Sequence, residues 1–181
     1  MTARQIGLLA LAAVLMFWAV GAYNRLVALR SAIVGAWAKV DDALHQRGAA
    51  ADALAAALRA PLAAESGALD AWQAALAEAA RAAATLGAKP VQQAHAVAWV
   101  AAEAALAAAA SRVFALLEQQ TELRQSEAVA GQVQAWQEAS KRLRFARQFF
   151  NEAAAPYDEA IATFPTSLLV RAFRFRAAGR L

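Results

Sequence analysis

The sequence predicts an all-α protein in which an N-terminal transmembrane helix continues into an elongated antiparallel bundle of about four helices. Three observations support this fold class. The 181 residues include only four prolines and eight glycines. Much of the 61% hydrophobic content is alanine, which has the highest helix propensity. Apolar residues recur at spacings of three and four, which places them on one face of a helix, and no stretch alternates as a strand would.

The longest periodic stretch runs from Val129 to Phe164. Steps of four and three give it five heptads of coiled-coil-like seam, in which only Ser140 and Arg147 are polar. At 1.5 Å per residue such a helix would extend about 54 Å. Pro156 would remove one backbone hydrogen bond, so a kink is expected near Ala153–Pro156. This face is predicted to pack against other helices.

Residues 1–23 are predicted to form a membrane anchor. No charge lies between Arg4 and Arg25, and the stretch from Ile6 onward is apolar or small for about 17 residues, near the lower limit for a membrane-spanning helix. Trp18 and Tyr23 are placed to lie at one membrane interface. A cleaved signal peptide is the alternative. The uncleaved anchor is favoured because the apolar run is longer than a typical signal sequence and no polar break follows it.

Helical periodicity continues through the bundle predicted over residues 24–165. Apolar residues recur from Leu26 to Leu44, Gly48 weakens this helix, and Pro61 begins a loop. The opposite, solvated side is expected to carry the charged residues Arg25, Arg30, Lys39, Asp41, Asp42 and Arg47.

Two further helices are predicted before the long seam. One carries Leu69 to Leu86 and stops at Gly87 and Pro90. The next runs from about Val91 to Gln120, with an alanine-rich middle. A polar turn is expected over Thr121–Glu127.

Residues 166–181 form a basic C-terminal segment in which Thr166 or Ser167 could cap a short helix. Residues 141–181 have a net charge of +5, whereas the whole chain has +4. On a helical wheel, Leu169 and Phe173 fall away from Leu168 and Phe175, so docking against the bundle is favoured over binding to an anionic membrane surface. Nucleic acid is not an expected partner.

Two motifs carry a family resemblance. The first is Tyr23–Arg30 followed by Ala36–Asp41; the second is Ala146–Asn151 followed by Tyr157, Ile161 and Phe164–Leu169. Their order and separation resemble the LemA family. The resemblance implies a single-pass bacterial membrane protein with an antiparallel helical bundle and no established biochemical activity.

The polar residues on the long seam predict a structural lock. Arg147 lies on the apolar face and Asn151 follows one turn later. A buried arginine must be paired or reach water. Asp41 and Asp42 on the first long helix are the expected partners, provided that the two ends of the chain pack side by side.

The sequence gives no indication of an enzyme. His45 follows Asp41 by one turn, but a solvated helix face explains the pair better than a metal site does. There is no metalloprotease helix motif, phosphate-binding glycine loop or serine elbow. No catalytic, cofactor-binding or metal-binding residue is therefore expected, and no cofactor.

The sequence favours a membrane-anchored helical scaffold or protein-interaction module without catalytic activity. Its expected partners are the lipid bilayer and either a second copy or other membrane-associated proteins. An accessory factor for an envelope protease or signalling system is the alternative. The basic residues Arg25, Arg30 and Lys39 after the anchor favour a domain on the cytoplasmic side of the bacterial cytoplasmic membrane.

Overall fold

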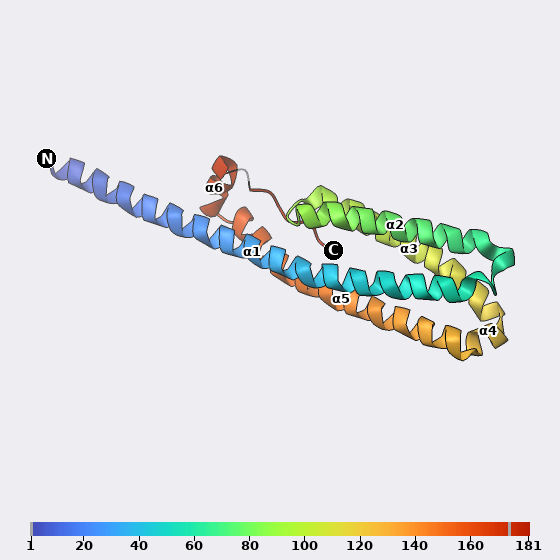
Figure 1. Cartoon of the computed structure of the whole chain (residues 1–181). Helices are drawn as coiled ribbons and strands as arrows, with labels where there is room; N and C mark the ends of the chain where they lie inside the picture. Colours follow the sequence, from blue (N-terminus) through green and yellow to red (C-terminus); the bar gives the residue numbers. More distant parts are fainter. Residues whose placement is uncertain (1, 174) are drawn as a thin grey trace.

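The computed structural model describes residues 2–173 and 175–181, and over these residues it is all-α with no strand (Figure 1). Four long helices form an elongated bundle, as predicted. Short helices complete the chain. The elements in order are α1 (Ala3–Arg59), a 3-10 turn (Ala63–Glu65), α2 (Ser66–Ala88), α3 (Gln93–Gln119), α4 (Thr121–Gln125), α5 (Glu127–Ala162) and α6 (Thr166–Phe173).

The predicted anchor and the first bundle helix form one helix, α1, of 57 residues. A capping box closes its N-terminus: the hydroxyl of Thr2 accepts from the Gln5 amide, and the Gln5 side chain accepts from the Thr2 amide. The helix also continues through Gly48, where a weak point was expected. Alanine-rich sequence on both sides and packing against α5 outweigh the cost of about 1 kcal/mol that a helical glycine carries.

The N-terminal part of α1 projects beyond the bundle (Figure 1). Its most apolar 18-residue window has a mean hydropathy of 2.2, and none of that window is buried. α3 is also long and apolar enough to cross a membrane, with a mean hydropathy of 1.7, but 22% of its window is buried among the other helices. The long, exposed, apolar N-terminal part of α1 is compatible with membrane anchoring.

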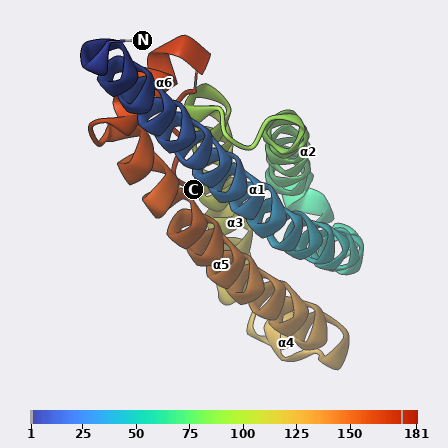
Figure 2. The ribbon, with the colours of Figure 1, turned by 90° about the vertical axis from the view of Figure 1, so that its left-hand side faces the viewer.

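The bundle consists of two antiparallel helix pairs, α1 with α5 and α2 with α3. α1 packs along α5, and the hydrogen bond from Arg142 to Gln46 (2.8 Å) together with the Lys39 ammonium over the Phe149 ring (4.3 Å) sets their antiparallel register. α2 packs along α3, and α2 also lies beside α1 (Figures 1 and 2). The apolar side of the α1–α5 pair therefore faces the apolar side of the α2–α3 pair.

Large aromatic side chains fill the space between the two helix pairs. Trp37 of α1 lies edge-on to Trp99 of α3, with ring centroids 6.3 Å apart, and edge-on to Phe150 of α5 at 6.2 Å. Further along the bundle, Trp72 of α2 meets Trp136 of α5 at 5.3 Å. These T-shaped contacts each add about 0.5–1.5 kcal/mol beyond the area they bury.

The predicted seam of α5 is confirmed at most of its apolar positions. The buried residues of α5 are Val129, Trp136, Ala139, Leu143, Ala146, Phe150, Ala154, Tyr157 and Ala160. Alanines thus take the most buried places beside the predicted seam positions Ser140, Arg147 and Ile161. A small side chain lets α1 approach closely, and the longer neighbours turn toward the edge of the interface.

The ends of α5 differ from their predicted positions. The helix passes through Pro156 without interruption and ends at Ala162. Phe164 lies beyond it and is 74% exposed. Most of the predicted polar turn over Thr121–Glu127 is a short helix, α4. The carbonyl oxygen of Ser126 then accepts hydrogen bonds from the Val129 and Ala130 amides, and α5 begins directly after Ser126.

The C-terminal segment is helical over α6, and residues 175–181 form a tail without regular secondary structure that ends at Leu181. Asp158 Oδ1 accepts from the Ala178 amide at 2.8 Å. Gly179 lies directly against Ala96, and no Cβ would fit there. Docking of the tail, predicted from the sequence, is therefore confirmed for residues 175–181, while Leu168 and Phe173 remain exposed. Arg174 and the side chain of Leu169 lie outside the described residues.

The buried hydroxyl of Tyr157 makes the stability of the fold depend on pH. Its hydroxyl donates to the Arg176 carbonyl oxygen at 2.9 Å, and burial raises the pKa of Tyr157 above 10.0, an effect that the charge of Arg30 only partly offsets. The unfolded chain therefore loses this proton first. The contribution of protonated Tyr157 to the free energy of unfolding is complete below pH 10.0 and is lost as the pH rises through the folded-state pKa of Tyr157.

We expect the free energy of unfolding of the full chain in detergent to fall between about pH 9 and 11, and Tyr157→Phe to make that fall shallower. Denaturant titrations measure both slopes. Tyr23→Phe is the control, because Tyr23 is exposed on α1. Identical slopes for the wild type and Tyr157→Phe would contradict the assignment.

Candidate functional site

The centre of the bundle contains a buried ion pair between Arg47 of α1 and Glu103 of α3. Arg47 Nη1 lies 2.6 Å from Glu103 Oε2, and Nη2 lies 2.6 Å from Oε1. The two side chains are only 9% and 10% exposed. The guanidinium also lies over the ring of Trp136 in α5, 5.7 Å from its centroid. Three helices therefore meet at one charged group.

Sequence reasoning missed this pair. The charge pattern predicts Arg47 on the solvated side of its helix, yet Arg47 lies seven residues after buried Val40 and four before buried Ala51. Glu103 likewise lies between Trp99 and Leu106 at spacings of four and three. Each helix therefore has one charged residue on its seam. Two opposite charges at matching seam positions were the signal that could have revealed the pair.

The predicted lock does not form as expected. Arg147 is half-buried and stacks on Trp99 of α3, with its guanidinium carbon 5.1 Å from the ring centroid. Asp41 instead faces His45 on its own helix, at 3.7 Å. Asp42 is exposed. The prediction was wrong because Asp41 and Asp42 lie on the edge of α1, whereas Arg147 turns toward α3.

Asn151 has a different role from the predicted one. Its Nδ2 donates to the Leu181 carbonyl oxygen, and its Oδ1 accepts from the Leu181 amide, both at 2.8 Å. This reciprocal pair holds the end of the C-terminal tail on α5. Of the four predicted lock residues, the structure thus brings Arg147 and Asn151 to the same side of α5 but pairs neither with Asp41 or Asp42.

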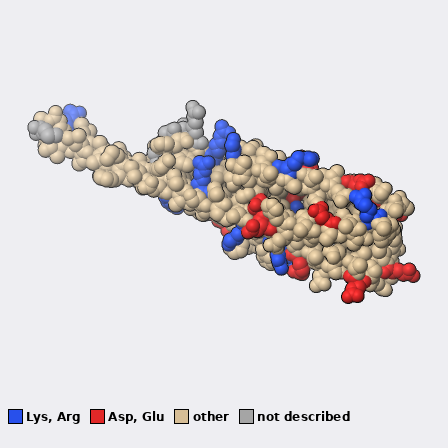
Figure 3. Space-filling view, in the orientation of Figure 1, with Lys and Arg blue, Asp and Glu red and all other residues tan. Residues whose placement is uncertain are grey.

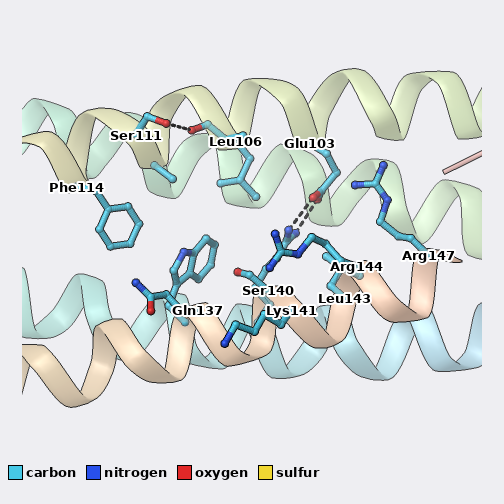
Figure 4. A pocket seen from close by; sticks show the side chains of 14 residues that line it. Glu103, Leu106, Ser111, Phe114, Gln137, Ser140, Lys141, Leu143, Arg144 and Arg147 are labelled. Atoms are coloured by element: carbon cyan, nitrogen blue, oxygen red, sulfur yellow. Dashed lines mark hydrogen bonds and ion pairs between the residues drawn. The ribbon is translucent and has the colours of Figure 1, made fainter.

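A groove runs between α3 and α5 beside the buried pair. Its cavity of about 460 Å³ has apolar walls that include Leu106, Phe114 and Leu143. Basic residues line its α5 side. Figure 4 shows the side chains of α3 and α5 facing one another across this space, with dashed lines marking the contacts of the Glu103 carboxylate. A second cavity of about 460 Å³ continues from Arg144 and Arg147 to Leu181.

The groove has an excess of positive charge. Lys141 is held by Glu138 at 2.8 Å, and this contact lowers the pKa of the Glu138 carboxyl. Among residues 2–173 and 175–181, Arg144 and Arg147 have no ion-pair partner. Two such guanidinium groups beside apolar walls are suited to a segment that has both carboxylates and apolar side chains.

The predicted anchor residues all lie on α1. Ile6 is 56% exposed and Tyr23 is 40% exposed, while Trp18 is half-buried. Over the part of the chain that the structure describes, no group of three or more His, Asp or Glu side chains is close enough to hold a metal ion.

A comparison with protein families supplies the identification. The LemA family profile matches residues 36–180, which extend from the middle of α1 through α5 to the docked tail. This chain belongs to the LemA family. The LemA match therefore includes Arg47, Glu103, both walls of the groove and the tail contacts of Asn151. It begins after the exposed apolar part of α1. A comparison with curated proteins found no match.

The buried ion pair gives a direct prediction. Glu103→Gln or Arg47→Ala leaves one charged or strongly polar group buried without its partner, so the full chain should lose about 3–5 kcal/mol of stability. The double variant Arg47→Met/Glu103→Leu should recover most of that loss, because two apolar side chains replace both charges.

Denaturant unfolding of the full chain in detergent measures these differences. Arg81→Ala is the control, since Arg81 pairs with Glu78 on the surface of α2, and it should leave the unfolding midpoint unchanged. Single and double variants of equal stability would contradict a coupled buried pair.

Proposed function

We propose that this LemA protein is a membrane-anchored helical scaffold or protein-interaction module without catalytic activity. The observation that carries the proposal is α1. The first part of this helix is apolar and has no buried residue in its most apolar window, and its second part forms a wall of the bundle. A helix of this kind fixes the bundle to a bilayer without a flexible linker.

The groove between α3 and α5 is the proposed interaction surface. Arg144 and Arg147 are free to pair with carboxylates, and the apolar walls would take the hydrophobic side of an amphipathic segment. The partner is therefore an acidic segment of another membrane-associated protein or of a second copy. In the alternative role, as an accessory factor for an envelope protease or signalling system, the protein would bind its enzyme partner through this same groove.

The proposed location is the bacterial cytoplasmic membrane, with a single span and the bundle on the cytoplasmic side. Arg25, Arg30 and Lys39 follow the apolar stretch, whereas Arg4 alone precedes it. An excess of basic residues on one flank favours retention of that flank in the cytoplasm.

A reporter fused after Leu181 tests this orientation. A cytoplasm-dependent reporter is expected to be active and a periplasm-dependent one inactive. Exchange of Arg25, Arg30 and Lys39 for glutamine should weaken this preference, because it removes the charge bias. Activity of only the periplasmic reporter in the wild type would reverse the orientation.

Site-specific photo-cross-linking tests the interaction surface. A cross-linker at Gln137, which lines the groove, should give a discrete adduct with the anchored full chain in membranes. Arg144→Glu/Arg147→Glu should abolish the adduct by charge repulsion, while Arg112→Glu on the exposed side of α3 should not.

The identity of the adduct separates the two proposed roles. An adduct with a second copy or a non-enzymatic membrane protein supports the scaffold. A stoichiometric enzyme adduct supports the accessory factor. An adduct that persists in the charge-reversed variant contradicts the groove as the binding surface.

A further inference from the structure

The C-terminal segment meets α1 where the exposed apolar part of α1 ends. The ring of Tyr23 packs against Phe173 and Phe175, with centroids 5.1 Å and 6.1 Å apart. α6 therefore lies beside the projecting part of the chain, away from the far end of the bundle (Figures 1 and 2). Three aromatic rings mark this junction.

Two adjoining cavities of about 480 Å³ each open at the junction. Arg30, Val34 and Phe175 line both of them. The first cavity is otherwise mainly apolar, with Tyr23, Val27 and Phe173 in its wall.

The second cavity adds Lys89, from the turn between α2 and α3, and Arg176, from the tail. The two adjoining cavities together thus have an apolar end and a basic end.

The basic end has no compensating charge among the described residues. Arg30, Lys89 and Arg176 are exposed and make no ion pair there, and no described carboxylate lines either cavity. The nearby carboxylate of Asp158 is occupied by Arg180 at 3.3 Å and by the Ala178 amide. Figure 3 shows basic side chains gathered where the projecting helix joins the bundle.

The depth of these residues matches the layers of a bilayer. A hydrocarbon core of about 30 Å, measured along α1 from Ile6, ends near Leu26. Leu26 is the first buried residue of the bundle core. The headgroup layer of about 5–7 Å then reaches Arg30. Tyr23 therefore lies level with the upper part of the lipid chains, Val27 lies at the boundary between chains and headgroups, and Arg30 lies level with the phosphates.

We propose that this junction binds one anionic phospholipid. Arg30, Lys89 and Arg176 hold its phosphate and headgroup charge, and an acyl chain lies against Tyr23, Val27 and Phe173. The inference rests on the proposed membrane anchoring and deepens it. The bound lipid would join α1, the α2–α3 turn and the tail, so that the bundle is attached to the membrane surface at a second point.

Lipid titrations of the full chain in a mild detergent, read by native mass spectrometry, test the proposal. One phosphatidylglycerol should be retained in clear preference to phosphatidylcholine. Arg30→Gln/Arg176→Gln should lower the affinity for phosphatidylglycerol about 30-fold, from the loss of two charges near the phosphate.

Arg25→Gln/Arg112→Gln removes the same net charge outside both cavities and should keep the preference. Equal binding of the two lipids by the wild type, or equal losses in both double variants, would overturn the proposal. Displacement of the lipid by soluble glycerol phosphate at similar concentration would also overturn it, because a free phosphate ester would then be the ligand.

Extraction of the wild-type chain from membranes separates this inference from the anchoring on which it rests. Release by high salt would overturn the anchor and the lipid site together. Retention through salt, combined with no preference among lipids, would overturn the lipid site alone.

Discussion

The continuity of α1 is the constraint on which the other elements depend. The helix spans 57 residues, about 85 Å at 1.5 Å per residue. Its exposed apolar part and its buried part are joined by unbroken backbone hydrogen bonds, so the height of the bundle above a bilayer follows from the length of the helix. The end of α6 and the C-terminal tail add to this by packing Phe173 and Phe175 on Tyr23, at the level where the core begins.

The bundle itself is held together by a few large side chains set in a framework of alanine. The backbones approach closely within the α1–α5 pair, within the α2–α3 pair and between α1 and α2. Alanine makes this close approach possible. Across the remaining space, Trp37, Trp99, Trp72 and Trp136 make the contacts. The Arg47–Glu103 pair adds direction, because its two parallel hydrogen bonds form in only one register of α1 against α3.

The periodic apolar pattern was enough to predict the four long helices, the α5 seam and the exposed N-terminal stretch. It could not place Arg47 correctly, because a charged residue was assumed to face solvent, although its spacing matched the buried face. The partner of Arg147 could not be predicted either, since the rotation of α5 that brings Arg147 over Trp99 depends on which alanines face α1. The tail has no periodicity, so its contacts with Asn151 and Asp158 emerge only from the fold.

A distance measurement tests the continuity of α1 most directly. The chain has no cysteine, so spin labels at Gly21→Cys and Ala53→Cys would be the only ones present. In the bilayer-embedded full chain, an uninterrupted helix predicts a narrow distance distribution near 48 Å between the labelled backbone positions. A broad distribution, or one centred well below that length, would show a hinge between anchor and bundle and would contradict a rigid attachment.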